Sequence, residues 1–254
     1  YSGTPFLFIL CGVVIFVPRP SRQCGLIVND KLMDIMTDTN ALMEPIDLVT
    51  WPRQQHFELF KNFTQPYFNV CVTLNAKPLF EYCKQNKLSF FQAYVHATLK
   101  ACHAYNPIML RIINECPWRL KQVRASVVEL ASDDSFIFSY FNYSPCLEEF
   151  AQHATAISAN AKSQPLFSQA FNQTEGQADL IHISVLPWLN FSSFSHAFSE
   201  GKSLGIPKFV FGQYDKTTGL MPFSIDVHHS LMDGLHVAAF INVLQNNIDD
   251  FCKD

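Results

Sequence analysis

The most constraining feature of this chain is a change of hydrophobic period near its C-terminus. Apolar residues at alternate positions from Phe223 to Val227 predict a half-buried strand, which runs directly into His228 and His229. After Gly234 the apolar residues recur at helical spacing, which predicts an amphipathic helix. A strand-to-helix corner of this kind holds its side chains on a rigid frame, so the two histidines are candidate reactive groups. The apolar positions of the helix are Val237, Phe240, Ile241, Leu244, Ile248 and Phe251.

Strand and helix patterns alternate through most of the preceding chain. We expect strands around residues 68–72, 120–130, 135–143 and 180–186, and helices over 78–84, 89–105 and 147–161. Ser89 is a suitable N-cap for the second of these helices, and Asn106-Pro107 should stop it. The alternation predicts an α/β fold in two layers, with a mixed β-sheet packed against helices.

The composition excludes several classes of protein. Of the 254 residues, 48% are apolar and 16% are charged, which excludes a disordered chain and suggests surface buried between subunits. The formal net charge of -4 comes without a run of lysine and arginine, so no nucleic-acid partner is expected. The eight cysteines show neither paired spacing nor a zinc-site grouping. We therefore expect reduced thiols, no metal site and a cytoplasmic location.

The N-terminal segment differs from the rest of the chain. Residues 5–17 form an apolar run that is too short to span a membrane comfortably and is not preceded by a positive charge. We interpret residues 1–36 as an apolar leader, either upstream sequence that is translated or a non-native extension, although a signal segment is an alternative. Residues 37–254 are predicted to form a single domain, with no membrane as a partner.

The stretch HHSLMDGLH at residues 228–236 resembles the HHxxxDG motif of the chloramphenicol acetyltransferase family. The acyltransferase domains of 2-oxoacid dehydrogenase complexes contain a related motif. The likeness extends over residues 45–253 and includes Trp51-Pro52-Arg53 with the nearby HFE at 56–58, and ISVLPWLNF at 183–191. The resemblance implies the CoA-dependent acyltransferase fold, a homotrimer, and acetyl transfer to a hydroxyl of chloramphenicol or a similar small acceptor, which confers antibiotic resistance. Acetyl-CoA would be a co-substrate, and no bound cofactor is implied.

The resemblance also implies roles for four residues. His229 matches the general base, and an imidazole that titrates near neutral pH suits the removal of a hydroxyl proton. Asp233 matches a structural aspartate that pairs with the arginine at position 53. Ser184 matches the serine that steadies the oxyanion of the tetrahedral intermediate. Two alternatives remain open from the residues alone. His229 could be a buried hydrogen-bonding group, or a metal ligand together with His228, Asp233 and His236, and Asp233 could simply cap the last helix.

The same match to the family's positions implies that six side chains line the acceptor pocket and that one lies at the acetyl-CoA end of the site. The pocket residues are Phe60, Phe68, Phe136, Phe167, Phe194 and His196, and the cofactor-end residue is Val210. Any one of these phenylalanines could instead belong to the core, because the chain has 24 of them.

Several positions differ from the family pattern and leave the acceptor and the strength of CoA binding open. Phe60 replaces a tyrosine, His196 a leucine, Val210 a threonine, Asp226 a glutamine and Leu235 an aromatic residue, while Ser89 and Gln213 replace two lysines linked to the cofactor phosphate.

Two other functions fit parts of the pattern. The chain could be the acyltransferase core of a 2-oxoacid dehydrogenase complex, but no arginine follows its histidine pair. It could also be a non-catalytic trimeric relative, since the two lysines and the threonine are lost. The presence together of Arg53, Ser184, His229 and Asp233 argues for an active acyltransferase.

Overall fold

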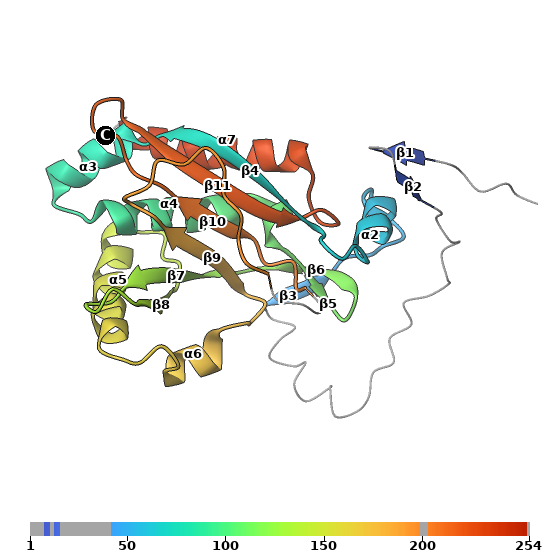
Figure 1. Cartoon of the computed structure of the whole chain (residues 1–254), viewed down its shortest axis with the longest axis horizontal. Helices are drawn as coiled ribbons and strands as arrows, with labels where there is room; N and C mark the ends of the chain where they lie inside the picture. Colours follow the sequence, from blue (N-terminus) through green and yellow to red (C-terminus); the bar gives the residue numbers. More distant parts are fainter. Residues whose placement is uncertain (1–7, 11–12, 16–41, 199–202, 253–254) are drawn as a thin grey trace, which may run out of the picture. The chain divides into compact units, whose positions relative to one another are not determined.

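The structure of the chain is a computed structural model, which describes residues 8–10, 13–15, 42–198 and 203–252 (Figure 1). It divides into two units, Tyr1–Thr39 and Asn40–Asp254. In the first unit, β1 (Phe8–Leu10) pairs with β2 (Val13–Ile15) in an antiparallel ladder. The remainder of the predicted leader at 1–36 lies outside the described residues, so its separation from a domain at 37–254 stays a prediction. In the ranges described, no helix is long and apolar enough to cross a membrane.

The second unit is built on a six-stranded mixed sheet. Its strand order is β4-β11-β10-β9-β7-β8, in which β9 runs parallel to both β10 and β7 and the other pairs are antiparallel. The predicted mixed α/β sheet is therefore confirmed. The strands are β4 (Tyr67–Asn75), β7 (Arg124–Leu130), β8 (Phe136–Phe141), β9 (Leu180–Val185), β10 (Lys208–Phe211) and β11 (Leu220–His228). A smaller sheet contains β3 (Met43–Pro45), β6 (Cys116–Leu120) and β5 (Leu110–Ile113) in that order.

The helices agree with the expected periodicity. The predicted helices correspond to α3 (Lys77–Asn86), α4 (Phe90–Ala104), α5 (Leu147–Lys162) and α7 (Gly234–Asp249). The Ser89 hydroxyl accepts the Gln92 backbone N–H as the N-cap of α4, and the helix gives way to a 3-10 turn at Asn106–Met109. The sequence did not indicate the two short helices α2 (Gln54–Phe60) and α6 (Gln169–Thr174), nor the 3-10 turn at Asp250–Cys252.

One face of the sheet carries the main core under α4 and α7 (Figure 1). The ring of Phe240 on α7 stacks on Phe209 of β10 with centroids 5.5 Å apart, and Tyr94 of α4 packs 4.6 Å from the ring of Phe211. Phe223, beside them on β11, has no exposed surface. This aromatic layer fixes the strand that leads to the histidine pair.

The opposite face of β11 differs from what its alternating pattern predicted. We expected a half-buried strand, but every residue from Met221 to His228 is buried. The polar side chains of this face have partners in the protein: the Asn69 amide donates to Ser224 Oγ at 2.7 Å and to Asp226 Oδ2 at 2.8 Å. These hydrogen bonds within the protein replace the ones that the groups lose to water when they are buried.

The packing under α7 sets the stability of the C-terminal corner. We expect Phe240→Ala to lower the free energy of unfolding by about 3–5 kcal/mol, because a fully buried phenylalanine leaves a cavity that the sheet cannot close. Denaturant unfolding followed by circular dichroism measures this change. Leu235→Ala on the same helix is the matched control, since Leu235 is 80% exposed and its loss should change stability by less than about 0.5 kcal/mol. Equal effects of the two substitutions would contradict the assigned core.

Candidate active site

The ring of His229 lies between two phenylalanines immediately after β11. It stacks on Phe60 of α2, with centroids 4.0 Å apart and planes 3° from parallel, and it packs 4.7 Å from the ring of Phe68 on β4. The backbone N–H of His229 donates to the carbonyl of Pro66 at 2.8 Å. Backbone and ring are therefore both held, and the histidine is fixed in one orientation. Within the described chain, His229 Nδ1 is buried and has no hydrogen-bond partner, which leaves Nε2 as the nitrogen available to a ligand.

A single arginine joins the elements around this histidine. Arg53, the residue before α2, donates from Nη1 to Asp233 Oδ2 at 2.5 Å and from Nη2 to the carbonyl of His229 at 3.2 Å. Asp233 in turn caps α7 by accepting the backbone N–H groups of Leu235 and His236. The predicted ion pair and the predicted helix cap are both present, so the two interpretations of Asp233 hold together.

The charges around Asp233 favour its ionised form. Burial opposes ionisation, but hydrogen bonds from His236 and Arg53, together with the charge of His236, outweigh it and hold the pKa of Asp233 well below its usual range. His236 Nδ1 lies 2.7 Å from Asp233 Oδ1, and the Arg53 side chain is only 12% exposed. The carboxylate is thus the counter-ion of a nearly buried guanidinium.

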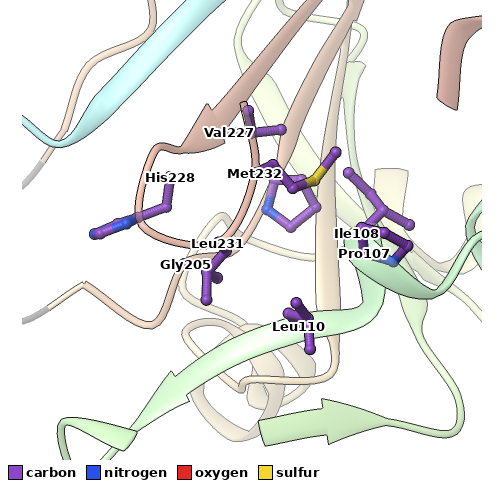
Figure 2. Close-up of a pocket in the computed structure, with 9 residues that line it drawn as sticks. Pro107, Ile108, Leu110, Gly205, Val227, His228, Leu231 and Met232 are labelled. Carbon is purple, nitrogen blue, oxygen red and sulfur yellow. The ribbon is translucent and has the colours of Figure 1, made fainter. Parts of the chain in front are cut away.

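The neighbouring His228 has a different environment. Burial, with a smaller contribution from His229, lowers the pKa of His228 to about 4. Its Nδ1 lies 2.7 Å from the Ser230 hydroxyl. His228 also borders a cavity of about 10 Å³ whose other walls include Leu110, Val227 and Met232 (Figure 2). That volume holds about one water molecule, so this cavity is too small for an acceptor. His228 is a neutral, buried structural histidine.

Ser184 lies on the polar face of the sheet, away from His229. It is half-buried on β9 and pairs with Val210 of β10, which pairs with Ser224 of β11. His229 is five residues beyond Ser224, so the two side chains are separated by roughly 16 Å along β11 and roughly 10 Å across the strands. The structure places Val210 beside Ser184, but the valine side chain has no exposed surface. Within one chain, Ser184 and His229 do not form one site.

The predicted pocket residues fall into three groups. Phe60 and Phe68 contact His229, as described above. Phe194 and His196 lie on the segment after β9, with their rings 4.8 Å apart. Phe136 and Phe167 lie toward the opposite edge of the sheet, on β8 and just before α6, where they are 51% and 69% exposed. They are joined there through Phe138 and Phe171, whose rings are 5.4 Å apart.

Sequence reasoning did not name Asn69 and gave no role to Asp226, two polar residues that the structure brings to this face. Asn69 donates to Asp226, and Asp226 lies 2.7 Å from the ring of His196. The signal available was a carboxylate at an inward position of an apolar strand, since a buried charge requires partners. Among the described residues, no group of three or more His, Cys, Asp or Glu side chains is placed to hold a metal ion.

Comparison with known proteins identifies the chain. The family model named chloramphenicol acetyltransferase matches residues 42–245. The chain belongs to the chloramphenicol acetyltransferase family. It is therefore an acyltransferase. The chloramphenicol acetyltransferase of Proteus mirabilis is 27% identical to it over 216 residues, which cover 82% of this chain and 95% of that protein. The chloramphenicol acetyltransferase of Escherichia coli is 25% identical over 223 residues, covering 81% of this chain and 94% of that protein.

Solved structures share the fold of this family member. A chloramphenicol acetyltransferase superposes with a TM-score of 0.71 at 21% identity, covering 83% of this chain and 99% of that one. The cubic core of the pyruvate dehydrogenase multienzyme complex superposes with a TM-score of 0.59 at 13% identity, covering 92% and 98%. The mixed α/β architecture is thus common to both of these structures and this chain.

The ion pair between Arg53 and Asp233 leads to a pH-dependent prediction. Because the folded-state pKa of Asp233 is lowered, its contribution to stability is present above the unfolded-state pKa of about 3.9 and is lost as the pH falls through the folded-state value. Asn at this position keeps a helix cap but removes the charge. We expect Asp233→Asn to be less stable than the wild type at pH 7, and the difference to shrink below about pH 4.

Chemical unfolding of both proteins at a series of pH values measures that difference. The low pKa of His228 also destabilises the folded protein as the pH falls, but it acts equally on both proteins and cancels in the comparison. A stability difference that is independent of pH would show that the charge of Asp233 does not support the corner.

Proposed function

We propose that this chain transfers an acetyl group from acetyl-CoA to a hydroxyl of chloramphenicol or a similar small acceptor, and so confers resistance to the antibiotic. The observation that supports the proposal is the fixed ring of His229, held between Phe60 and Phe68 at a corner tied by Arg53 and Asp233. Catalytic imidazoles need such positioning, because proton transfer requires a fixed distance to the substrate hydroxyl.

The proposed reaction uses His229 and Ser184 in turn. His229 Nε2 removes the proton of the acceptor hydroxyl as its oxygen attacks the thioester carbonyl, and a carbon–oxygen bond forms. The hydroxyl of Ser184 donates a hydrogen bond to the resulting oxyanion. When the tetrahedral intermediate collapses, the carbon–sulfur bond breaks and the CoA thiolate takes up the proton from the imidazolium. The products are the acetylated acceptor and free CoA, and His229 returns to its neutral form.

The separation of Ser184 from His229 supports a site shared between copies of the chain. A general base and an oxyanion donor that act on one intermediate must lie within a few ångströms of it, whereas a single chain holds them on different parts of the sheet. We propose a homotrimer in which His229 of one copy faces Ser184 and Val210 of the next, with acetyl-CoA bound at the Val210 end. The exposed rings of Phe136 and Phe167 are then surfaces for the acceptor and the neighbouring copy.

A cytoplasmic location is part of the same proposal. Cys83 and Cys102 are free thiols in the core, and burial raises their pKa to about 11 and about 12, which keeps them protonated and unreactive. Buried free thiols suit a reducing compartment, where acetyl-CoA is made and used.

The base is tested by a pair of neighbouring substitutions. His229→Ala should lower the turnover number by about 10² to 10⁴, measured as the release of CoA thiol from acetyl-CoA and chloramphenicol, with little change in stability. His228→Ala should mainly lower the free energy of unfolding, because His228 is buried and bonded to Ser230. Near-normal turnover by His229→Ala would contradict the proposed role of His229 as the general base.

The shared site is tested by mixing two inactive variants. His229→Ala and Ser184→Ala homo-oligomers should each have little activity. Mixed subunits, formed by co-expression, should recover about one quarter of the wild-type activity, because half of the subunits supply His229, half supply Ser184, and the two intact residues meet at random. No recovery in verified mixed oligomers would show that each site lies within one copy.

A further inference from the structure

A segment after β9 lies across the polar face of the sheet. Residues 186–198, which we call the strap, begin where the backbone N–H of Leu186 donates to the carbonyl of Phe211 and that of Gln213 donates to the carbonyl of Leu189, both at 2.8 Å. Near its other end, Lys208 Nζ donates to the carbonyl of Ala197 at 2.8 Å. The strap thus returns along β10 from Phe211 to Lys208, over the face that carries Ser184.

The strap is also joined to the sheet by a buried histidine–aspartate pair. His196 Nδ1 lies 2.7 Å from Asp226 Oδ2, and the two side chains are only 11% and 4% exposed. Asp226 is itself held by the Asn69 amide at 2.8 Å. Because an ionised carboxylate can only accept hydrogen bonds, Nδ1 must carry the proton that His196 donates. Asp226 therefore fixes the tautomer and the direction of the imidazole.

The second nitrogen of this ring is left without a partner. His196 Nε2 is fully buried, and no group in the described part of the chain makes a hydrogen bond to it. In the neutral ring with Nδ1 protonated, Nε2 presents a lone pair and accepts from an O–H or N–H donor. A buried acceptor without a donor destabilises a fold, so an oriented one indicates a donor that arrives from outside.

The surroundings of Nε2 indicate what brings the donor. Asp226 is two residues from Ser224 on β11, and Ser224 is in register with Val210 and Ser184, so the histidine–aspartate pair and the proposed oxyanion donor share one face. The ring of Phe194 packs edge-on against His196, at 4.8 Å between centroids. An aromatic ring beside a fixed hydrogen-bond acceptor suits a ligand that has both a ring and a hydrogen-bond donor.

We propose that His196 is a specificity-determining residue, which accepts a hydrogen bond from a second hydroxyl or amide N–H of the acceptor, and that Asp226 is its positioning residue. This inference rests on the proposed function for the reacting hydroxyl, which is a different group of the same molecule. The preferred acceptors are then aromatic alcohols that carry a second hydrogen-bond donor. Nε2 is buried within the chain, so the acceptor reaches it through a shift of the strap, which carries His196 and has neither helix nor strand.

The test compares two phenylpropanols that differ in one group. One has a single terminal hydroxyl and the other has a second hydroxyl on the benzylic carbon. Isothermal titration calorimetry should show about tenfold tighter binding of the diol by the wild type, from one net hydrogen bond. His196→Leu should remove this preference or reverse it, since the apolar side chain favours the mono-alcohol. Asp226→Asn should reduce the preference for the diol, because the amide no longer holds the His196 ring in the same tautomer and direction.

Ser195→Ala is the matched control, because Ser195 is the exposed neighbour of His196 on the strap. It should keep the tenfold preference. Equal binding of the two alcohols by the wild type, or a preference that persists in His196→Leu, would overturn the assignment of Nε2. Release of the CoA thiol is measured in parallel with both alcohols. If binding shows a preference that depends on His196 but no acetyl group is transferred, the proposed reaction is wrong, whereas recognition of the second hydroxyl by His196 is supported.

Discussion

The ion pair between Arg53 and Asp233 is the interaction on which the site depends. One guanidinium binds the cap of α7 and the carbonyl of His229, so it joins the N-terminal part of the domain to the C-terminal strand and helix. Both partners are needed, because a guanidinium that is only 12% exposed has little access to water in place of the carboxylate. The orientation of His229 therefore depends on a contact between segments that are far apart in sequence, and the aromatic core under α7 holds the frame in which that contact forms.

The sheet places the residues that we propose for catalysis and acceptor binding far apart within one chain. His229 follows the end of β11, Ser184 lies on β9, and the exposed phenylalanines lie toward the opposite edge near β8. A mixed sheet allows this arrangement, since its strands present polar groups on one face while the other face carries the core. Ser224 and Asp226 of β11 are buried with hydrogen bonds from Asn69 on the neighbouring strand β4, whereas Phe136 and Phe167, toward the β8 edge, are exposed.

Local patterns predicted most of the elements but not the relations between them. The period change after Gly234 located α7, and Ser89 located the start of α4, because both signals depend only on neighbouring residues. The burial of β11 was misjudged, since alternation of polar and apolar residues does not reveal that Asp226 has partners on β4 and the strap. The arginine partner of Asp233 came from the family likeness alone. The distance between Ser184 and His229 could not be foreseen, because it follows from strand order, which single segments do not encode.

The stacking of His229 on Phe60 joins the proposed base to a weakly secured element of the domain. Helix α2 has seven residues, one buried side chain and no side-chain cap at its start, so its attachment relies on the Arg53 contacts and on Phe57. Segments with few buried contacts open locally, at a free energy below that of global unfolding. Opening of α2 would release one wall of the imidazole while the sheet stays intact. An opening of this one short helix is therefore enough to loosen the imidazole, without any loss of the core under α7.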